Sequence, residues 1–220
     1  HWVGPGYVSS EWLPYHGKCM YIDPKGGGAD SVGYCVAASL NGMIFVLDAG
    51  ELAAGQSGTS EATMIKLAKV AAEFEVQRVV VESNWGGSKD ESTYAKLLQP
   101  VMAKHNGPTQ IDLNYVTGQK ERRILDVLEP LFNVHRIVFS ERAAKCVEMS
   151  RQLARITRDR GSLDHDDIID ALYGAVAQFS DLVVLDPEVR EKEYKHQQAV
   201  EVAREFDDYT KANTSWLNPN

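Results

Sequence analysis

The sequence predicts an α/β fold whose mixed central sheet begins with an antiparallel meander and is covered by helices on both faces. Two β-rich runs, residues 32–40 and 43–47, are joined by Asn-Gly at 41–42, a strong hairpin signal because both residues tolerate positive φ. Residues 79–81 form a continuous β-branched run, as in a strand that is buried on both faces. Strands then alternate with helical segments, which is typical of layered α/β proteins.

The remaining elements follow in order along the chain. A first strand over residues 19–23 opens the three-strand meander and is followed by a glycine-rich turn. Apolar residues recur at helical spacing up to residue 74, which predicts a helix that begins near residue 60. Further helices are expected over roughly 91–105, 119–132, 141–156 and 164–180, and further strands over 78–81, 111–116 and 136–139.

Length and composition fit one folded domain. The chain has 220 residues, of which 44% are hydrophobic and 25% charged, as in a globular protein that can bury a full core. We expect this domain over residues 1–185, followed by an acidic helix and tail over residues 186–220. No apolar run approaches the ~18–20 residues that cross a bilayer, and the first six residues lack the pattern of a signal peptide. Neither export nor a membrane partner is expected.

The three cysteines, Cys19, Cys35 and Cys146, form no CxxC pair. An odd number of well-separated cysteines indicates reduced thiols in a cytosolic compartment. Cys19 and Cys35 lie in strand-like apolar runs, where cysteine usually acts as a small hydrophobic residue.

The net charge of −8 argues by itself against a nucleic-acid partner. The charge is unevenly distributed, however. Residues 118–160 contain ten Lys or Arg and six Asp or Glu, so this segment carries +4 and the remainder −12. Such a segment fits either a pair of solvated helices or a binding site for a polyanion.

Two carboxylates lie at the predicted ends of strands. Asp23 ends the first strand, before the glycine-rich turn, and Glu82 ends the buried strand. Ligand and catalytic groups in open α/β sheets gather at such strand ends. The alternatives are a turn aspartate before proline for Asp23, and an ordinary strand-terminating charge for Glu82.

Acidic residues also crowd the start of the helix expected over 164–180, at Asp164, Asp166, Asp167 and Asp170. Acids near a helix N-terminus stabilise the helix by about 0.3–1 kcal/mol each through its dipole. This effect explains the presence of one or two of them. Asp167 and Asp170 lie three residues apart, on one face close to the apolar stripe. Burying like charges there is costly unless a cation compensates, and a divalent metal is the simplest compensation.

The three sites together predict a metal-dependent enzyme that hydrolyses phosphodiester bonds. Oxygen ligands of this kind select Mg²⁺ or Mn²⁺. Two ions about 3.5–4 Å apart can activate a water and stabilise the leaving 3′ oxygen, with Asp23 bridging both and Glu82 and Asp167 each holding one side. The metal ligands expected from this argument are Asp23, Glu82, Asp167 and Asp170. His165 is either a ligand or proton carrier, or a helix-start histidine with a local hydrogen bond.

Three motifs resemble the nuclease domain of phage large terminase subunits, most of all the short-tailed, T7-like branch. They are Tyr-Ile-Asp-Pro-Lys-Gly-Gly at residues 21–27, Val-Val-Val-Glu-Ser-Asn at 79–84 and His-Asp-Asp-Ile-Ile-Asp-Ala-Leu at 165–172. Gly-Gln-Lys-Glu-Arg-Arg-Ile at 118–124 also resembles that branch. The likeness covers roughly residues 15–180. Each motif is weak alone, but three in order at fitting separations are specific.

The resemblance implies a ribonuclease H-like fold and an endonuclease that cuts concatemeric viral DNA during genome packaging in the host cytoplasm. It implies double-stranded DNA, the terminase ATPase domain, the small terminase subunit and the portal as partners. The P-loop of the ATPase motor, G-x-x-x-x-G-K-[ST], does not occur in this sequence. The chain is therefore expected to be the C-terminal half of such a subunit, either excised or separately made, without ATP hydrolysis.

The resemblance also assigns residues. The acidic positions of the family map to Asp23, Glu82 and the Asp166/Asp167 pair, so the resemblance adds Asp166 to the expected metal ligands. Resolvases of the same fold use a D-x-x-D-A pattern, which here begins at Asp167. The two registers agree on Asp167, which we expect as the third catalytic acid, and they differ over Asp166 and Asp170.

In this interpretation the basic segment binds DNA. Three basic residues at the start of a helix, Lys120, Arg122 and Arg123, are expected to bind phosphates. They would position the duplex without sequence specificity. Lys25, in the glycine-rich turn, is expected to reach the scissile phosphate.

Two alternatives keep the same acids. A junction-selective resolvase would be dimeric and prefer four-way junctions. A non-catalytic DNA clamp or motor-docking module would not respond to metal.

Overall fold

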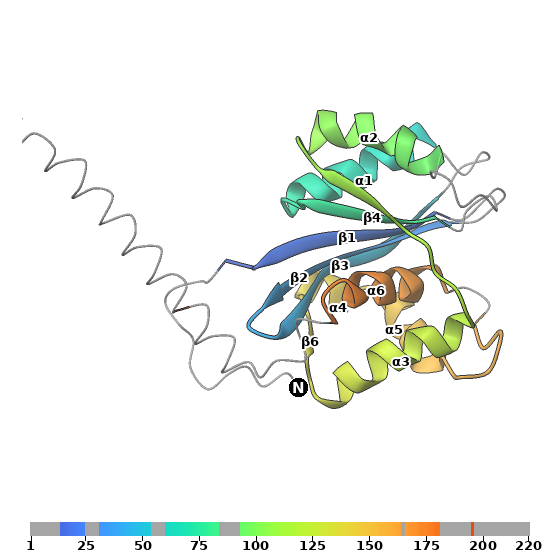
Figure 1. The fold of residues 1–220 in the computed structure, drawn as a ribbon. Helices are drawn as coiled ribbons and strands as arrows, with labels where there is room; N and C mark the ends of the chain where they lie inside the picture. The colour runs from blue at the N-terminus through green and yellow to red at the C-terminus, as the bar shows by residue number, and fades with distance from the viewer. Residues whose placement is uncertain are drawn as a thin grey trace, which may run out of the picture.

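A six-stranded mixed sheet forms the centre of the protein (Figure 1). The structure, a computed structural model, describes residues 14–24, 31–53, 60–83, 93–163, 166–180 and 195. Its sheet has the strand order β5-β4-β1-β2-β3-β6. The strands are β1 (Gly17–Pro24), β2 (Ser31–Leu40), β3 (Met43–Ala53), β4 (Arg78–Glu82), β5 (Gln110–Asn114) and β6 (Ile137–Phe139).

The predicted antiparallel meander is confirmed in β1, β2 and β3. Asn41 and Gly42 both have positive φ, 50° and 71°, as the hairpin signal required. β3 continues beyond its predicted end to Ala53, because β2 offers a partner along its whole length, as far as Ser31 opposite Ala53. A bulge opposite Val36 and Ala37 interrupts this pairing.

The other strands are parallel to their neighbours, which makes the sheet mixed, as predicted. β4 pairs with β1, β5 pairs with β4, and β6 pairs with β3. Because β1, β4 and β5 run in the same direction, their carboxyl ends meet at one edge of the sheet.

Helices cover both faces of the sheet (Figure 1). One face carries α1 (Glu61–Glu73) and α2 (Thr93–His105). The other carries α3 (Lys120–Asn133), α4 (Glu141–Ala144), α5 (Val147–Arg155) and α6 (Asp167–Ala177). The single helix predicted over 141–156 is two helices, because Cys146 has an extended backbone (ψ 92°) that interrupts the helical hydrogen bonds.

β1 lies between two hydrophobic cores. Met20 and Ile22 pack into the core beneath α1 and α2, whereas Cys19 and Tyr21 pack into the core beneath α6. All four side chains are buried. Alternate residues of a strand point to opposite faces, and both faces are covered here. Residues 19–22 are therefore all apolar.

Two glycines let α6 lie directly on β1 and β2. A Cβ at Gly174 would meet ring atoms of Tyr21 at 2.4 Å, and a Cβ at Gly33 would meet the backbone oxygen of Asp167 at 2.1 Å. Neither contact leaves space for a larger residue. The close approach brings the first turns of α6 to the carboxyl ends of the strands.

The start of α6 is held by a side chain from another helix. The N-cap residue Asp166 makes no side-chain cap hydrogen bond. Instead the buried Gln152 of α5 accepts a hydrogen bond from the backbone N–H of Ile169 at 2.9 Å. This bond satisfies one of the donors that a helix N-terminus leaves unpaired, and it links the position of α6 to that of α5.

No helix in the described part of the chain is long and apolar enough to cross a membrane. The three cysteines are free thiols. Apart from Lys195, the acidic tail expected over residues 186–220 lies outside the described residues, so its predicted helix stays a prediction.

Candidate metal centre

Asp23 and Glu82 lie side by side at the ends of two parallel strands. The last registered pair of β1 and β4 is Ile22 with Val81, and the two acids come next on each strand. By alternation, Asp23 shares the face of Tyr21, and Glu82 shares that of Val80, which is the face beneath α6. The two carboxylates therefore point to the same side of the sheet.

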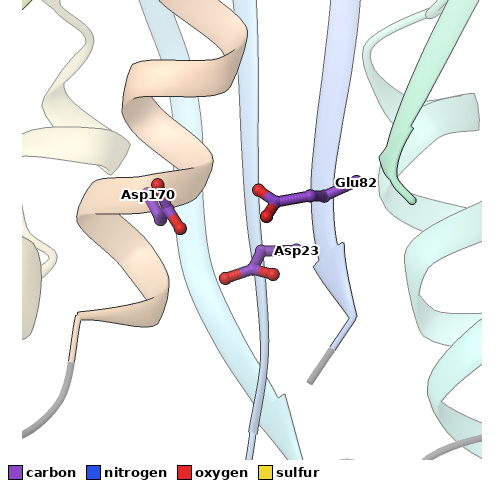
Figure 2. Close-up of side chains that lie close together, drawn as sticks. All are labelled: Asp23, Glu82 and Asp170. Atoms are coloured by element: carbon purple, nitrogen blue, oxygen red, sulfur yellow. The ribbon is translucent and has the colours of Figure 1, made fainter. Parts of the chain in front are cut away.

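Asp170 completes the group from α6. One oxygen each of Asp23, Glu82 and Asp170 lie within 4.8 Å of one another. Figure 2 shows the three side chains converging from the two strands and the helix. All three residues are buried, with exposed fractions of 6%, 8% and 2%. Three buried carboxylates in this space repel one another strongly unless positive charge lies among them.

Two cations of α3 supply positive charge beside this group. Lys120 Nζ lies 2.8 Å from Asp170 Oδ2 and 3.0 Å from Asp166 Oδ1. Arg123 lies 3.2 Å from Asp170 Oδ1, and its guanidinium stacks over the ring of Tyr173 at 5.2 Å from the centroid. Both cations are partly buried, so their attraction to the acids is less screened than at the surface.

The pKa values of this cluster reflect the balance between burial and charge. Burial raises the pKa of Glu82, and so does the neighbouring Asp170, although Arg123, Lys120 and a hydrogen bond from Tyr21 act in the opposite direction. For Lys120, burial lowers the pKa, but attraction to Asp170, Asp23 and Asp166 and the hydrogen bond to Asp170 together leave the pKa raised. Lys120 is therefore charged at neutral pH.

Asp167, the acid expected first from the sequence, lies outside the group of three. It is buried, and its Oδ2 accepts a hydrogen bond from Ser31 Oγ at 2.8 Å. The same hydroxyl lies 3.1 Å from Glu51 Oε2. Asp167 and Asp170 share a face of α6, but Asp167 packs against β2 at Gly33, whereas Asp170 reaches the ends of β1 and β4. The catalytic role of Asp167 stays a prediction.

The residues expected to bind DNA have different surroundings in the structure. Lys120 and Arg123 turn toward the acids, whereas Arg122, between them on α3, is exposed. Lys25 and His165 lie outside the described residues.

Sequence reasoning missed three uncharged side chains near the acids. Tyr21 donates a hydrogen bond to Glu82, and Asn114 donates one to Tyr21. The position of Tyr21 could have been predicted, because it lies two residues before Asp23 on the same strand and so shares its face of the sheet. The positions of Asn114 and Gln152 could not, since they follow from pairing and packing across the chain.

The donor set fits a hard divalent cation. Asp23, Glu82 and Asp170 offer carboxylate oxygens only, from three different elements, with no sulfur or imidazole among them. Such oxygen sites suit Mg²⁺ and Mn²⁺ better than zinc.

The geometry can be compared with known proteins. Residues 22–137 match the family described as "Terminase Bacteriophage T7, Ribonuclease H-like domain", more than half of the chain. The chain belongs to this family. The matched range contains Asp23 and Glu82 and ends before α6. The resemblance to the T7-like branch that the motifs carried is confirmed.

A related large terminase subunit comes from Enterobacteria phage T3. It is 33% identical over an alignment of 187 residues, and the match covers 78% of this chain and 30% of that protein. This terminase domain thus spans less than a third of the length of that relative.

Solved structures of terminases share the fold. The nuclease domain of human cytomegalovirus terminase, Mn-soaked and inhibitor-bound, has a TM-score of 0.53 and 14% identity, over 80% of this chain and 86% of that one. A mutant form of part of the large terminase subunit from bacteriophage Sf6, with calcium, has a TM-score of 0.50 and 12% identity, over 75% of this chain and 90% of that one. These likenesses and the family match confirm the predicted ribonuclease H-like fold.

Proposed function

We propose that this domain is an endodeoxyribonuclease that uses Mg²⁺ or Mn²⁺ to cut concatemeric viral DNA during genome packaging. The convergence of Asp23, Glu82 and Asp170 is the observation that supports this most. The nuclease domain of human cytomegalovirus terminase, which has the same fold, was itself soaked with Mn. The proposal places the protein in the reducing host cytoplasm, on double-stranded DNA, with the ATPase domain, the small subunit and the portal as partners.

Asp23, Glu82 and Asp170 are the proposed ligands of a first ion. Asp166 and Asp167 are the candidates for a second, because both lie within about one turn of Asp170 at the start of α6. Bound ions of this kind supply Lewis-acid stabilisation of the phosphate and a nucleophile at neutral pH.

The basic residues have two proposed roles. Lys120 and Arg123 pair with Asp170 and so balance the negative charge of the acids. From the same position they can also attract a DNA phosphate. The exposed Arg122 faces solvent, as a residue that positions the DNA backbone must. Lys25 keeps its expected role at the scissile phosphate.

The proposal predicts metal-dependent cleavage by the purified chain. Supercoiled plasmid is expected to be nicked and linearised with Mn²⁺ or Mg²⁺, and to stay intact with EDTA. At 100 times its dissociation constant, the ion should raise the free energy of unfolding by about 2.7 kcal/mol, or roughly 5–11 °C in melting temperature. No cleavage together with no metal-induced shift would favour the clamp, and a preference for four-way junctions would favour a resolvase.

Lys120 gives a second prediction. Lys120→Met is expected to lower the free energy of unfolding in EDTA by about 1–3 kcal/mol, because buried acids lose a charged partner. Mn²⁺ should reduce this loss, since the ion supplies the missing positive charge. Urea unfolding with and without Mn²⁺ measures both effects.

Lys145→Met is the matched control for this change. Lys145 pairs with Glu141 at the surface, with exposed side-chain fractions of 72% and 85%, so its replacement should cost about 0–1 kcal/mol, independent of metal. An equal loss for Lys120→Met in EDTA and in Mn²⁺ contradicts the proposed charge balance.

A further inference from the structure

Tyr21 lies in β1 with its hydroxyl against the acidic group. The residue is completely buried, and its ring packs on Gly174 of α6. The hydroxyl lies 3.3 Å from Glu82 Oε2 and 3.2 Å from Asn114 Nδ2. A tyrosine hydroxyl, an amide and a candidate ligand thus form a row across three neighbouring strands, β1, β4 and β5.

The donors and acceptors present fix the direction of both hydrogen bonds. An amide nitrogen can only donate, so Asn114 donates to the hydroxyl oxygen. The hydroxyl has one proton, and Glu82 is the acceptor within reach, so Tyr21 donates to the carboxylate. The hydrogen bond from Asn114 polarises the hydroxyl and makes it a better donor.

The backbone holds Asn114 in place at the far end of this row. Asn114 is registered opposite Glu82 in the pairing of β4 and β5. The N–H of Ser83 donates to the carbonyl oxygen of Asn114 at 2.9 Å. The backbone of Asn114 is therefore fixed at the end of the sheet, with its side-chain amide within hydrogen-bond distance of Tyr21.

We propose that Tyr21 and Asn114 are positioning residues that orient the carboxylate of Glu82 for a divalent cation. This inference rests on the proposed function of the acidic group. A glutamate side chain has several rotatable bonds, so a ligand at this position loses conformational entropy when it binds. A donor that occupies Oε2 removes that freedom beforehand. Partners of this kind commonly change metal affinity about 10–100-fold when they are removed.

A matched tyrosine on the same sheet distinguishes positioning from packing. Tyr34 of β2 is also buried, and its hydroxyl donates to a carboxylate, Asp48 Oδ2, at 3.2 Å. It belongs to the core on the opposite face, beneath α1 and α2. Tyr34→Phe therefore makes the same chemical change at a comparable hydrogen bond, but away from the acidic group.

The experiment measures Mn²⁺ affinity by titration calorimetry of the purified chain, with urea unfolding in EDTA as the test of folding. We expect Tyr21→Phe to weaken Mn²⁺ binding about 10-fold, and Tyr34→Phe to leave it unchanged. Equal affinities for the unmodified chain, Tyr21→Phe and Tyr34→Phe overturn the positioning role while the metal site stands. An unmodified chain that does not bind Mn²⁺ overturns both the metal site and this inference.

Asn114→Leu tests the far end of the row and serves if Tyr21→Phe does not fold. It should weaken Mn²⁺ binding less than Tyr21→Phe does, because the hydroxyl remains but loses its polarising donor. The double variant should bind Mn²⁺ no more weakly than Tyr21→Phe alone, since both changes act through one hydrogen bond to Glu82. Losses that multiply in the double variant, or an unchanged affinity for Asn114→Leu, overturn the proposed row.

Discussion

Asp170→Asn is expected to lower the rate of Mn²⁺-dependent plasmid cleavage by more than about 100-fold. This loss exceeds the roughly 10–100-fold effect of removing a residue that only hydrogen-bonds to a metal ligand, because Asp170 is itself a proposed ligand. Asparagine keeps the shape of the side chain but removes the charge that an ion among Asp23, Glu82 and Asp170 requires. Asp23→Asn should have an effect of the same size, because Asp23 belongs to the same group. Initial rates of nicking at saturating Mn²⁺, with Mn²⁺ affinity from calorimetry, measure the loss.

Two further aspartates of the chain control this result. Asp126→Asn changes an exposed acid that pairs with Arg158 on the surface, and should leave cleavage unchanged. Asp167→Asn changes the buried acid one turn before Asp170, whose carboxylate is held by Ser31. We expect a smaller loss there than at Asp170. The reverse order would show that the residue ranked first from the sequence is the third catalytic acid, and would refute the assignment of Asp170.

Folding must be measured together with activity in these variants. Asp170 pairs with Lys120 and Arg123, so its replacement leaves two partly buried cations with less compensation. A decrease in the free energy of unfolding is therefore expected beside the loss of cleavage. Circular dichroism and urea unfolding in EDTA separate an inactive folded protein from an unfolded one.

Gly174→Ala is expected to destabilise the protein by about 1–3 kcal/mol, as overpacked cores do, which is roughly 2–12 °C in melting temperature. Helix propensity alone predicts the opposite sign, because alanine is favoured over glycine inside a helix by about 1 kcal/mol. The added Cβ would meet the ring of Tyr21 at 2.4 Å, and a ring enclosed between a helix and a sheet cannot move aside. The same displacement should move Asp170 from the strand ends and weaken Mn²⁺ binding.

Gly33→Ala and Gly17→Ala complete this comparison. At Gly33 the Cβ would meet the backbone oxygen of Asp167 at 2.1 Å, and backbone cannot rotate away, so the loss should be at least as large as at Gly174. At Gly17 the nearest atom, in the ring of Phe179, is 3.9 Å away, which is ordinary contact. Gly17→Ala should therefore be nearly neutral. A Gly174→Ala protein as stable as Gly17→Ala would contradict the close packing of α6.

Several features of the fold followed from local pattern alone. The hairpin at Asn41-Gly42 and the alternation of strands and helices depend on residues near one another in sequence, and both are present. The break at Cys146 was not predicted, because it interrupts a segment whose composition remains helical on both sides. Strand pairing partners were also beyond local pattern, since β1 pairs with β4, far along the chain and beyond β2, β3 and α1.

The sequence by itself determined that Asp23 and Glu82 each end a strand and that an acidic helix start follows far along the chain. Only the tertiary structure decided that Asp170 joins them, that Lys120 and Arg123 turn toward the acids, and that Tyr21 and Asn114 lie behind Glu82. The physical reason is that helical spacing places Asp167 and Asp170 on the same face. Which of the two reaches the strand ends depends on where α6 packs along β1 and β2. Gly33 and Gly174 set that position, because they allow the helix to contact the sheet directly.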